Sequence, residues 1–174
     1  KSADLDSFVD GLTYGKVIPT LAIGCRSPHE LDFLESISPL IKSTGIDIFN
    51  TSSDPRIVIG DANNLSNFPK GHFDLVYSSH NLEHLSDPIS HFKTLREITT
   101  ECSKMYYVVP CWSGARGPSK GHPNYIHCTH SHGSFTEENV KKYLEEVCES
   151  ETNLLFIHKD ESNRDLHFCF EYIN

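Results

Sequence analysis

The sequence lacks the features that mark membrane-spanning and disulfide-stabilised proteins. No apolar run approaches the roughly 20 residues that a helix needs to cross a bilayer. The start of the chain, KSADLDSFVDGL, has neither the basic region nor the apolar stretch of a secretion signal. The six cysteines are scattered without a CxxC pair, which indicates reduced intracellular thiols rather than a disulfide framework. We therefore expect a cytoplasmic protein that does not insert into membranes.

Basic residues and methionine are also scarce. Only 15 Lys and Arg stand against 24 Asp and Glu, so the formal net charge is -9. Extended DNA or RNA is therefore an unfavourable partner, because neutralisation of phosphates by Lys and Arg drives most nucleic-acid affinity. Met105 is the only methionine, and the chain begins at Lys1. We expect residues 1–174 to be one domain excised from a longer chain, whose other domains are candidate partners.

What the sequence does contain is an alternation of strand-length apolar runs with helical patterns. This order is typical of βαβ units and a parallel sheet. Asp87 and Pro88 have the residue types of an N-cap and a first helical position. The predicted strands are residues 17–23, 45–49, 56–59, 73–78, 105–110, 153–159 and 165–173, and the predicted helices are residues 29–41, 88–98 and 135–147. We predict an α/β fold with about seven strands, mostly parallel, a C-terminal antiparallel hairpin and helices on both faces.

Two connections in this pattern have unusual lengths. Only residues 50–55 join the second and third strands, where a parallel crossover usually has a dozen residues, so the helix expected there is missing. Residues 110–134, in contrast, form a long segment rich in Gly, Pro, Ser and His, and loops of that length usually have a function. Because this segment follows the fifth strand, we expect it to form the wall of an acceptor site.

Two segments of the chain resemble a known enzyme family. FDLVYSSHNLEHLSDP, residues 73–88, contains a strand followed by L-E-H, and LAIGCRSPHELDFL, residues 21–34, contains a strand that ends at a glycine. Both resemble the class I S-adenosylmethionine-dependent methyltransferases of the type 11-like branch, and the resemblance covers roughly residues 21–135. It implies a methyltransferase with a Rossmann-like sheet that binds S-adenosylmethionine at the carboxyl ends of its strands.

The resemblance implies cofactor contacts where the first four strands end. Gly24 would let the backbone approach the methionine part of the cofactor, because glycine has no Cβ. Asp47 would accept hydrogen bonds from both ribose hydroxyls, and Asp61 would accept one from the adenine amino group. The cofactor-binding candidates are Gly24, Cys25, Arg26, Asp47, Ile48, Asp61, Ala62 and Ser79.

The first turn departs from the pattern of this family. The usual G-x-G-x-G is Gly24, Arg26 and Pro28 here, and Ala22 stands where the family has an acid two residues before the first glycine. The guanidinium of Arg26 suits the methionine carboxylate through its bidentate fork. The alternatives are an ordinary strand-to-helix turn at Gly24 and a surface acid that caps a turn at Asp61.

The segment after the fourth strand also suggests a metal site. His80, Glu83 and His84 have the spacing i, i+3 and i+4, which would place them on one face of a helix. Such ligands suit a divalent ion, either Mg2+ or Mn2+ if water and substrate oxygens complete the shell. The pattern resembles the E-x-x-E-H of metal-dependent ribose and ubiquinone-pathway O-methyltransferases, in which a further histidine precedes the next helix; here His132 has that place. The alternative is that Glu83 and His84 are local caps without a metal.

The leading hypothesis for function is O-methylation of a hydroxyl on a polar acceptor such as a sugar or glycan. The polar segment 110–134 suits a hydrophilic acceptor, and the acidic chain favours a neutral glycan over RNA. Without a metal, His80 or His127 would be the general base. The alternatives are methylation of a small phenol or amine or of an RNA 3' end, and a cofactor-binding module without catalysis.

Overall fold

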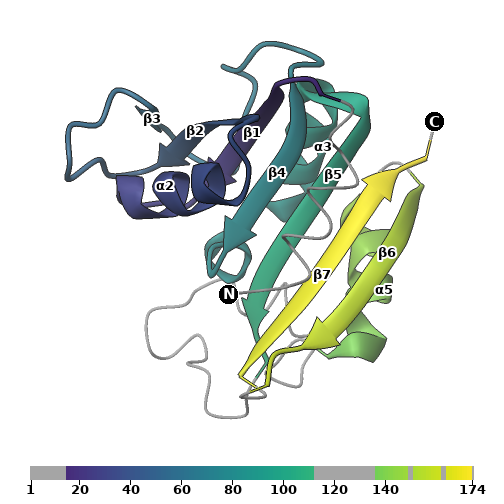
Figure 1. The fold of residues 1–174 in the computed structure, drawn as a ribbon. Coiled ribbons are helices and arrows are strands. Elements are labelled where there is room, and N and C mark those ends of the chain that lie inside the picture. The colour runs from purple at the N-terminus through teal and green to yellow at the C-terminus, as the bar shows by residue number, and fades with distance from the viewer. Residues whose placement is uncertain (1–14, 112–135, 149–150, 162–163, 174) are drawn as a thin grey trace.

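The computed structural model describes residues 15–111, 136–148, 151–161 and 164–173, whose strands form one seven-stranded sheet (Figure 1). The strands are β1 (Ile18–Ile23), β2 (Ile41–Asp47), β3 (Ile57–Ile59), β4 (Phe73–Ser79), β5 (Thr99–Pro110), β6 (Thr152–Lys159) and β7 (Asp165–Tyr172). The helices are α2 (Pro28–Ile37), the short 3-10 helix η1 (Leu82–His84), α3 (Pro88–Ile98) and α5 (Glu137–Val147). In these ranges no helix is both long and apolar enough to cross a membrane. The five cysteines that lie there are all free.

The sheet order is β3-β2-β1-β4-β5-β7-β6. The first five strands pair in parallel, whereas β7 is antiparallel to both β5 and β6. The predicted fold class is therefore confirmed, including the C-terminal hairpin at the sheet edge. The order reverses between β1 and β4, and open α/β sheets bind ligands where the order reverses, outside the carboxyl ends of the strands.

Helices cover both faces of the sheet, α2 on one face and α3 with α5 on the other (Figure 1). Successive residues of β1 alternate between these faces: Ala22 packs in the cluster with Leu31 and Leu34 of α2, while Leu21 and Ile23 pack in the cluster that contains α3. All of these side chains are buried, as expected for a central parallel strand covered on both sides.

The helix starts agree with the sequence prediction, but the end of α2 does not. The Asp87 carboxylate accepts a hydrogen bond from the Ser90 N–H at 3.0 Å, so Asp87 is the N-cap of α3. The prediction that the first helix reaches residue 41 is wrong, because α2 ends at Ile37. Ser38 is extended, at φ -148° and ψ 135°, and the following Pro39 disfavours a helical conformation at that position. The chain therefore enters β2 at Ile41.

β5 begins six residues earlier than predicted, at Thr99 rather than at residue 105. Thr99 pairs with Phe73 of β4, and the regular register resumes only at Leu75 and Lys104. The irregularity between these pairs inserts extra residues into β5, as a β-bulge does. The apolar pattern of the sequence is interrupted there, which explains why it indicated only the last part of the strand.

No helix follows β2 before β3 begins at Ile57, which confirms that this crossover is short. Hydrogen bonds within the connection take the place of the helix. The Asn50 Nδ2 donates to the carbonyl oxygens of Asp54, at 3.1 Å, and Ile57, at 3.3 Å. The Asn50 Oδ1 accepts from the Ser52 N–H at 3.1 Å. These bonds satisfy backbone groups that a helix would otherwise pair.

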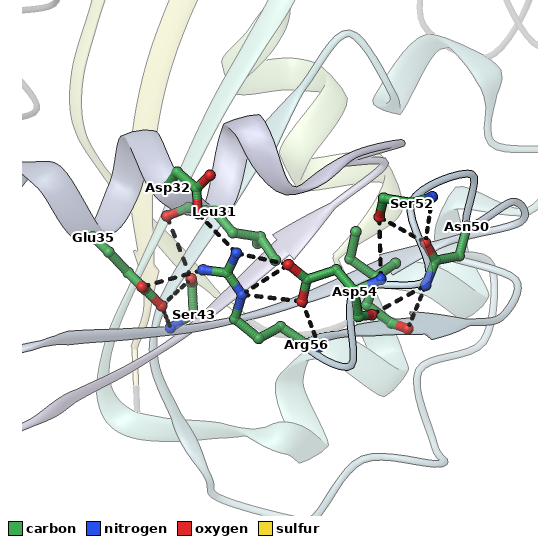
Figure 2. Close-up of polar contacts among 9 residues, drawn as sticks. Leu31, Asp32, Glu35, Ser43, Asn50, Ser52, Asp54 and Arg56 are labelled. Atoms are coloured by element: carbon green, nitrogen blue, oxygen red, sulfur yellow. Dashed lines mark hydrogen bonds and ion pairs between the residues drawn. The ribbon is translucent and has the colours of Figure 1, made fainter.

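Arg56 attaches this short connection to α2 (Figure 2). Its guanidinium donates two hydrogen bonds to the Asp54 carboxylate, with Nε 3.1 Å from Oδ1 and Nη2 2.8 Å from Oδ2. The same group reaches Asp32 at 2.7 Å and Glu35 at 3.2 Å, both on α2. Glu35 in turn accepts hydrogen bonds from the hydroxyl and the N–H of Ser43 on β2. One cation thus joins the loop after β2 to the helix before it.

We expect Arg56→Met to lower the free energy of unfolding at neutral pH by about 1 kcal/mol, the upper end of the range for partly exposed ion pairs. The hydrogen bonds from Arg56 lower the pKa of Asp54. Burial acts to raise the pKa of Glu35, but the hydrogen bonds from Ser43 and the charge of Arg56 outweigh it, so the pKa of Glu35 is lowered as well. Groups with a lowered pKa stabilise the fold fully above the ordinary carboxyl pKa of about 4 and lose this effect as the pH falls below it.

Urea unfolding at pH 7 and pH 3 checks this expectation, since the difference between the wild type and Arg56→Met should narrow at pH 3. Lys70→Met is the matched control, because the ion pair of Lys70 with Glu97 is mostly exposed and should contribute little. Equal stability of wild type and Arg56→Met at pH 7 would contradict the role given to Arg56.

Candidate functional site

A cavity of about 730 Å3 opens at the carboxyl ends of β1, β2 and β3, beside the segment that follows β4. Most of the residues proposed from sequence for cofactor binding line this cavity, namely Gly24, Arg26, Asp47, Ile48, Asp61 and Ala62. His80 and His84 line it as well. Residues from four separate segments thus converge because parallel strands deliver their carboxyl ends to one edge of the sheet.

Gly24 has a conformation and a neighbour that both require glycine. Its φ of +77° lies in the left-handed region, which is costly for residues with a side chain. A Cβ at this position would lie 2.7 Å from the Cβ and Oδ1 of Asn81. The turn after β1 therefore fits closely against the start of η1. The following Arg26 also has a positive φ, 49°, so the departure from the family pattern has not removed the sharp turn.

Asp47 holds two loops of the cavity with one buried carboxylate. Its Oδ2 accepts from the Arg26 N–H at 3.0 Å, and its Oδ1 accepts from the Phe49 N–H at 2.9 Å. The residue is 8% exposed. Because a carboxylate has about four lone-pair sites, each oxygen keeps capacity for a further donor.

The loop after β3 forms another part of the cavity wall. The Asp61 Oδ1 accepts hydrogen bonds from both the N–H and the Nδ2 of Asn63, at 2.8 and 2.7 Å. Asp61 is exposed, whereas Ala62 is buried. Ile48 and Phe49 add apolar surface to this end, since both line the cavity and are 61% and 66% exposed. A flat apolar ring system is the kind of ligand that such exposed side chains would cover.

Two cofactor candidates lie away from the cavity lining. Cys25 is buried in the core cluster under α2, with its sulfur beside Gly45, and burial raises the pKa of its thiol to about 12. Ser79 is the last residue of β4 and also does not line the cavity.

The L-E-H segment forms η1, a 3-10 helix from Leu82 to His84, rather than an α-helix that includes His80. The expectation of one shared helical face is therefore wrong for His80. That residue has φ 51°, and its N–H donates to the Val108 carbonyl of β5 at 2.9 Å. Its backbone thus continues the sheet pairing before the chain turns into η1.

The imidazole of His80 lies between two carboxylates. Its Nδ1 is 3.7 Å from Oε1 of Glu83, and its Nε2 is 3.3 Å from Oδ2 of Asp165. Glu83 raises the pKa of His80 and Asp165 adds to this effect, although burial opposes it. Glu83 is only 2% exposed, and its Oε2 has no hydrogen-bond partner in the part of the chain that the structure describes. An additional donor would therefore be stabilised beside Glu83.

The described residues bring only some of the proposed metal ligands together. The His84 Nε2 lies 3.9 Å from the same Glu83 oxygen that faces His80. Among residues 15–111, 136–148, 151–161 and 164–173, no group of three or more His, Cys, Asp or Glu side chains is arranged to hold a metal ion. His127 and His132 lie outside the described residues.

Two polar residues at the site escaped the sequence analysis. Asn81 lines the cavity, and its buried Nδ2 has no hydrogen-bond partner within the described ranges. Its position directly after His80 was the available signal. His91 is buried beneath the loop after β3 and contacts the Ala62 carbonyl at 2.6 Å. Sequence gave no reason to separate His91 from the other histidines.

We expect Gly24→Ala to impair both stability and ligand binding, because the new methyl group would meet Asn81 in a strained backbone conformation. Gly71→Ala is a matched control: Gly71 also has a positive φ, +58°, but nothing lies within 4 Å of an added Cβ. Both variants should lose about 1 kcal/mol or more from backbone strain. Thermal unfolding and calorimetry with S-adenosylhomocysteine should show weakened binding only for Gly24→Ala. Unchanged binding by that variant would contradict the close fit of Gly24.

Comparisons with known proteins agree with this architecture. Residues 21–104 match the model of a family described as a methyltransferase domain. No curated protein sequence gives a significant match. A SAM-dependent methyltransferase from Aquifex aeolicus has a similar structure, with a TM-score of 0.69 and 12% sequence identity over 98% of this chain and 90% of that chain.

Two further similar structures differ in the atom that their names say is methylated. The 1,6-didemethyltoxoflavin-N1-methyltransferase of Burkholderia thailandensis, solved with 1,6-didemethyltoxoflavin and S-adenosylhomocysteine, has a TM-score of 0.70 and 10% identity over 99% of this chain and 78% of that chain. The CurJ carbon methyltransferase has a TM-score of 0.70 and 11% identity over all of this chain and 56% of that chain. At these identities the likeness shows the fold. The family match over residues 21–104 supports a class I S-adenosylmethionine-dependent methyltransferase domain in that part of the chain.

Proposed function

We propose that the cavity at the carboxyl ends of β1 to β3 holds S-adenosylmethionine, and that the chain transfers its methyl group to a hydroxyl of a polar acceptor such as a sugar or glycan. The observation behind the cofactor site is the meeting of Gly24, Asp47 and Asp61 around one cavity. Gly24 and Arg26 would hold the methionine part, Asp47 the ribose hydroxyls and Asp61 the adenine amino group. When bound, the cofactor supplies a methyl group activated on a sulfonium.

The residues present fit this cofactor in three ways. Gly24 lines the cavity with the Asn81 side chain packed where a Cβ would lie, and the buried Nδ2 of Asn81 has no hydrogen-bond partner among the described residues. The exposed side chains of Ile48 and Phe49 offer an apolar surface for the adenine ring. The two Asp47 oxygens retain acceptor capacity for ribose hydroxyls while they hold the surrounding loops.

The proposed acceptor end lies at His80 and η1. A hydroxyl must lose its proton to become a methyl acceptor, so a base is required near the site. His80 is a candidate because Asp165 and Glu83 flank its two ring nitrogens and would stabilise the protonated imidazole. His127 remains a second candidate from the sequence. The role of these residues is to place the acceptor oxygen and to receive its proton.

A divalent metal at His80, Glu83, His84 and His132 remains part of the proposal. The imidazoles of His80 and His84 face the Glu83 Oε1 at 3.7 and 3.9 Å, and imidazole and carboxylate are ligand types that suit a divalent ion. The described side chains alone do not form a complete metal site. His132 would have to supply the further ligand.

Methylation of an amine is the second candidate function. The Oε2 of buried Glu83 has no donor among the described residues; the N–H of a neutral amine would satisfy it and leave the nitrogen lone pair available for the methyl group. The name of one similar structure specifies methylation at nitrogen.

Asp47→Ala should weaken binding of S-adenosylhomocysteine by about 1.5 to 3 kcal/mol, the contribution of hydrogen bonds to a charged group. Calorimetry on the purified variant measures this directly. Asp32→Ala is a control, because Asp32 also bonds through its carboxylate but contacts Arg56 on the outside of α2. Full affinity of a folded Asp47→Ala variant would remove Asp47 from the cofactor site.

A transfer assay with labelled S-adenosylmethionine and a panel of polyols, glycans, phenols and amines tests the acceptor class. We expect product only from hydroxyl acceptors, and loss of turnover but not of S-adenosylhomocysteine binding in the presence of a chelator. Full activity in chelator would refute the metal, and His80→Gln should then lower kcat by roughly 100-fold or more if His80 is the base. Product formed only from amines would favour the second candidate.

A further inference from the structure

The loop from Gly60 to Leu65 forms one wall of the cavity and is joined to the sheet at its first residue, where the Gly60 N–H donates to the Asp47 carbonyl of β2 at 2.9 Å. It follows β3, which has three residues and pairs only with β2 at the sheet edge. Within the loop, the Asn64 N–H donates to the Asp61 carbonyl at 3.0 Å, and Asn63 donates to the Asp61 carboxylate. These local bonds shape the turn but do not fix it relative to the rest of the molecule.

Helix α3 supports the rest of the loop through three contacts on one side of the helix. The contacts join the Asp87 N–H to the Asn63 Oδ1 at 2.7 Å, the His91 Nδ1 to the Ala62 carbonyl at 2.6 Å, and the Leu65 N–H to the Thr94 Oγ1 at 3.0 Å. The residues that α3 and its N-cap contribute are Asp87, His91 and Thr94. They are spaced by four and three positions, so they lie in one row along the helix. The loop is therefore attached to α3 at Ala62, Asn63 and Leu65.

His91 is the central and most buried member of this row, with 0% exposure. Its second ring nitrogen, Nε2, lies 2.8 Å from the hydroxyl of Tyr107 on β5. A carbonyl can only accept, so Nδ1 must carry the proton that it donates to Ala62, and the Nε2 of the neutral ring accepts the Tyr107 O–H. Burial lowers the pKa of His91 to about 4 and raises that of Tyr107, which keeps both groups neutral.

We propose that His91 is a positioning residue of the cofactor site, which holds the Ala62 carbonyl against α3 through its Nδ1 donor and thereby fixes Asp61 for recognition of the adenine base. The proposal rests on the cofactor site proposed above. Asp61 directly precedes Ala62, so a shift of that carbonyl moves the carboxylate that should read the adenine amino group. His91 would thus set base specificity without contact to the cofactor.

The alternative is that His91 only fills the core. It packs edge-on against Phe92 and Tyr107, so a substitution would also lower stability. The two roles differ in what they change. Loss of packing alone lowers the melting temperature and leaves the preference of the folded protein for adenine intact, whereas loss of the Ala62 contact changes that preference.

The test compares binding of S-adenosylhomocysteine with binding of S-inosylhomocysteine, in which a carbonyl replaces the adenine amino group. Calorimetry is done on the wild type and on His91→Phe, His91→Asn and Tyr107→Phe. The Nδ2 of asparagine can replace the His91 Nδ1 as donor to Ala62, whereas phenylalanine cannot donate. Tyr107→Phe keeps the donor to Ala62 and removes only the bond to Nε2.

We expect the wild type to prefer the adenine ligand and His91→Phe to lose about tenfold of that preference, which corresponds to about 1.4 kcal/mol. His91→Asn and Tyr107→Phe should melt earlier than the wild type but keep the preference. The proposal is overturned if a folded His91→Phe keeps the full preference, or if Tyr107→Phe loses as much of it. If His91→Phe does not fold, loss of the preference in His91→Asn would also overturn it.

The proposed cofactor site fails in a different way. A wild-type protein that binds both ligands equally would show that Asp61 does not read the base, and it would overturn the site and the role of His91 together. If the wild type prefers the adenine ligand and all three variants keep that preference in full, only the role of His91 is overturned.

Discussion

The cavity depends on one buried carboxylate. Asp47 accepts the N–H of Arg26 from the turn after β1 and the N–H of Phe49 from its own loop, and its carbonyl accepts the N–H of Gly60 at the end of β3. A single residue at the end of β2 thus connects the segments that follow three neighbouring strands. Hydrogen bonds of an N–H to a carboxylate are about twice as strong as neutral ones, so the Asp47 carboxylate holds these loops more firmly than a neutral acceptor would. The sharp turn at Gly24 is stable because its neighbours are held in this way.

The two other loops of the cavity are supported by different chemistry, and burial explains the difference. The loop after β2 is held by charges: Arg56 is 30% exposed at its side chain, so its ion pairs with Asp32 and Glu35 keep part of their hydration. The loop after β3 is held by the neutral imidazole of His91, which is completely buried and donates to the Ala62 carbonyl. An unpaired charge in that position would cost several kcal/mol or more in desolvation. Each loop therefore receives the kind of support that its surroundings allow.

These supports also explain what the sequence could predict. Strands, their parallel order and the N-cap at Asp87 follow from patterns within a few residues, and the convergence of Asp47 and Asp61 follows from the geometry of parallel strands. The bond of His91 to Ala62 joins residues 29 positions apart and depends on how α3 packs, so no local pattern indicates it. The spacing of His80, Glu83 and His84 was misleading for a related reason. Pairing of His80 with β5 outweighs the helical tendency of the segment after β4.

The charges around His80 would restrict what is methylated at the proposed acceptor end. Glu83 and Asp165 flank His80, so one protonated imidazole faces two carboxylates and the local charge stays negative when both are ionised. The same carboxylates raise the pKa of His80 and so favour transfer of a proton to it from a neutral hydroxyl, because the imidazolium that forms is stabilised on both sides. An acceptor that carries a phosphate or carboxylate near the reacting atom would be repelled instead. The arrangement thus favours neutral or cationic acceptors over anionic ones, which is the property expected for an uncharged sugar hydroxyl or, in the second candidate function, for an amine.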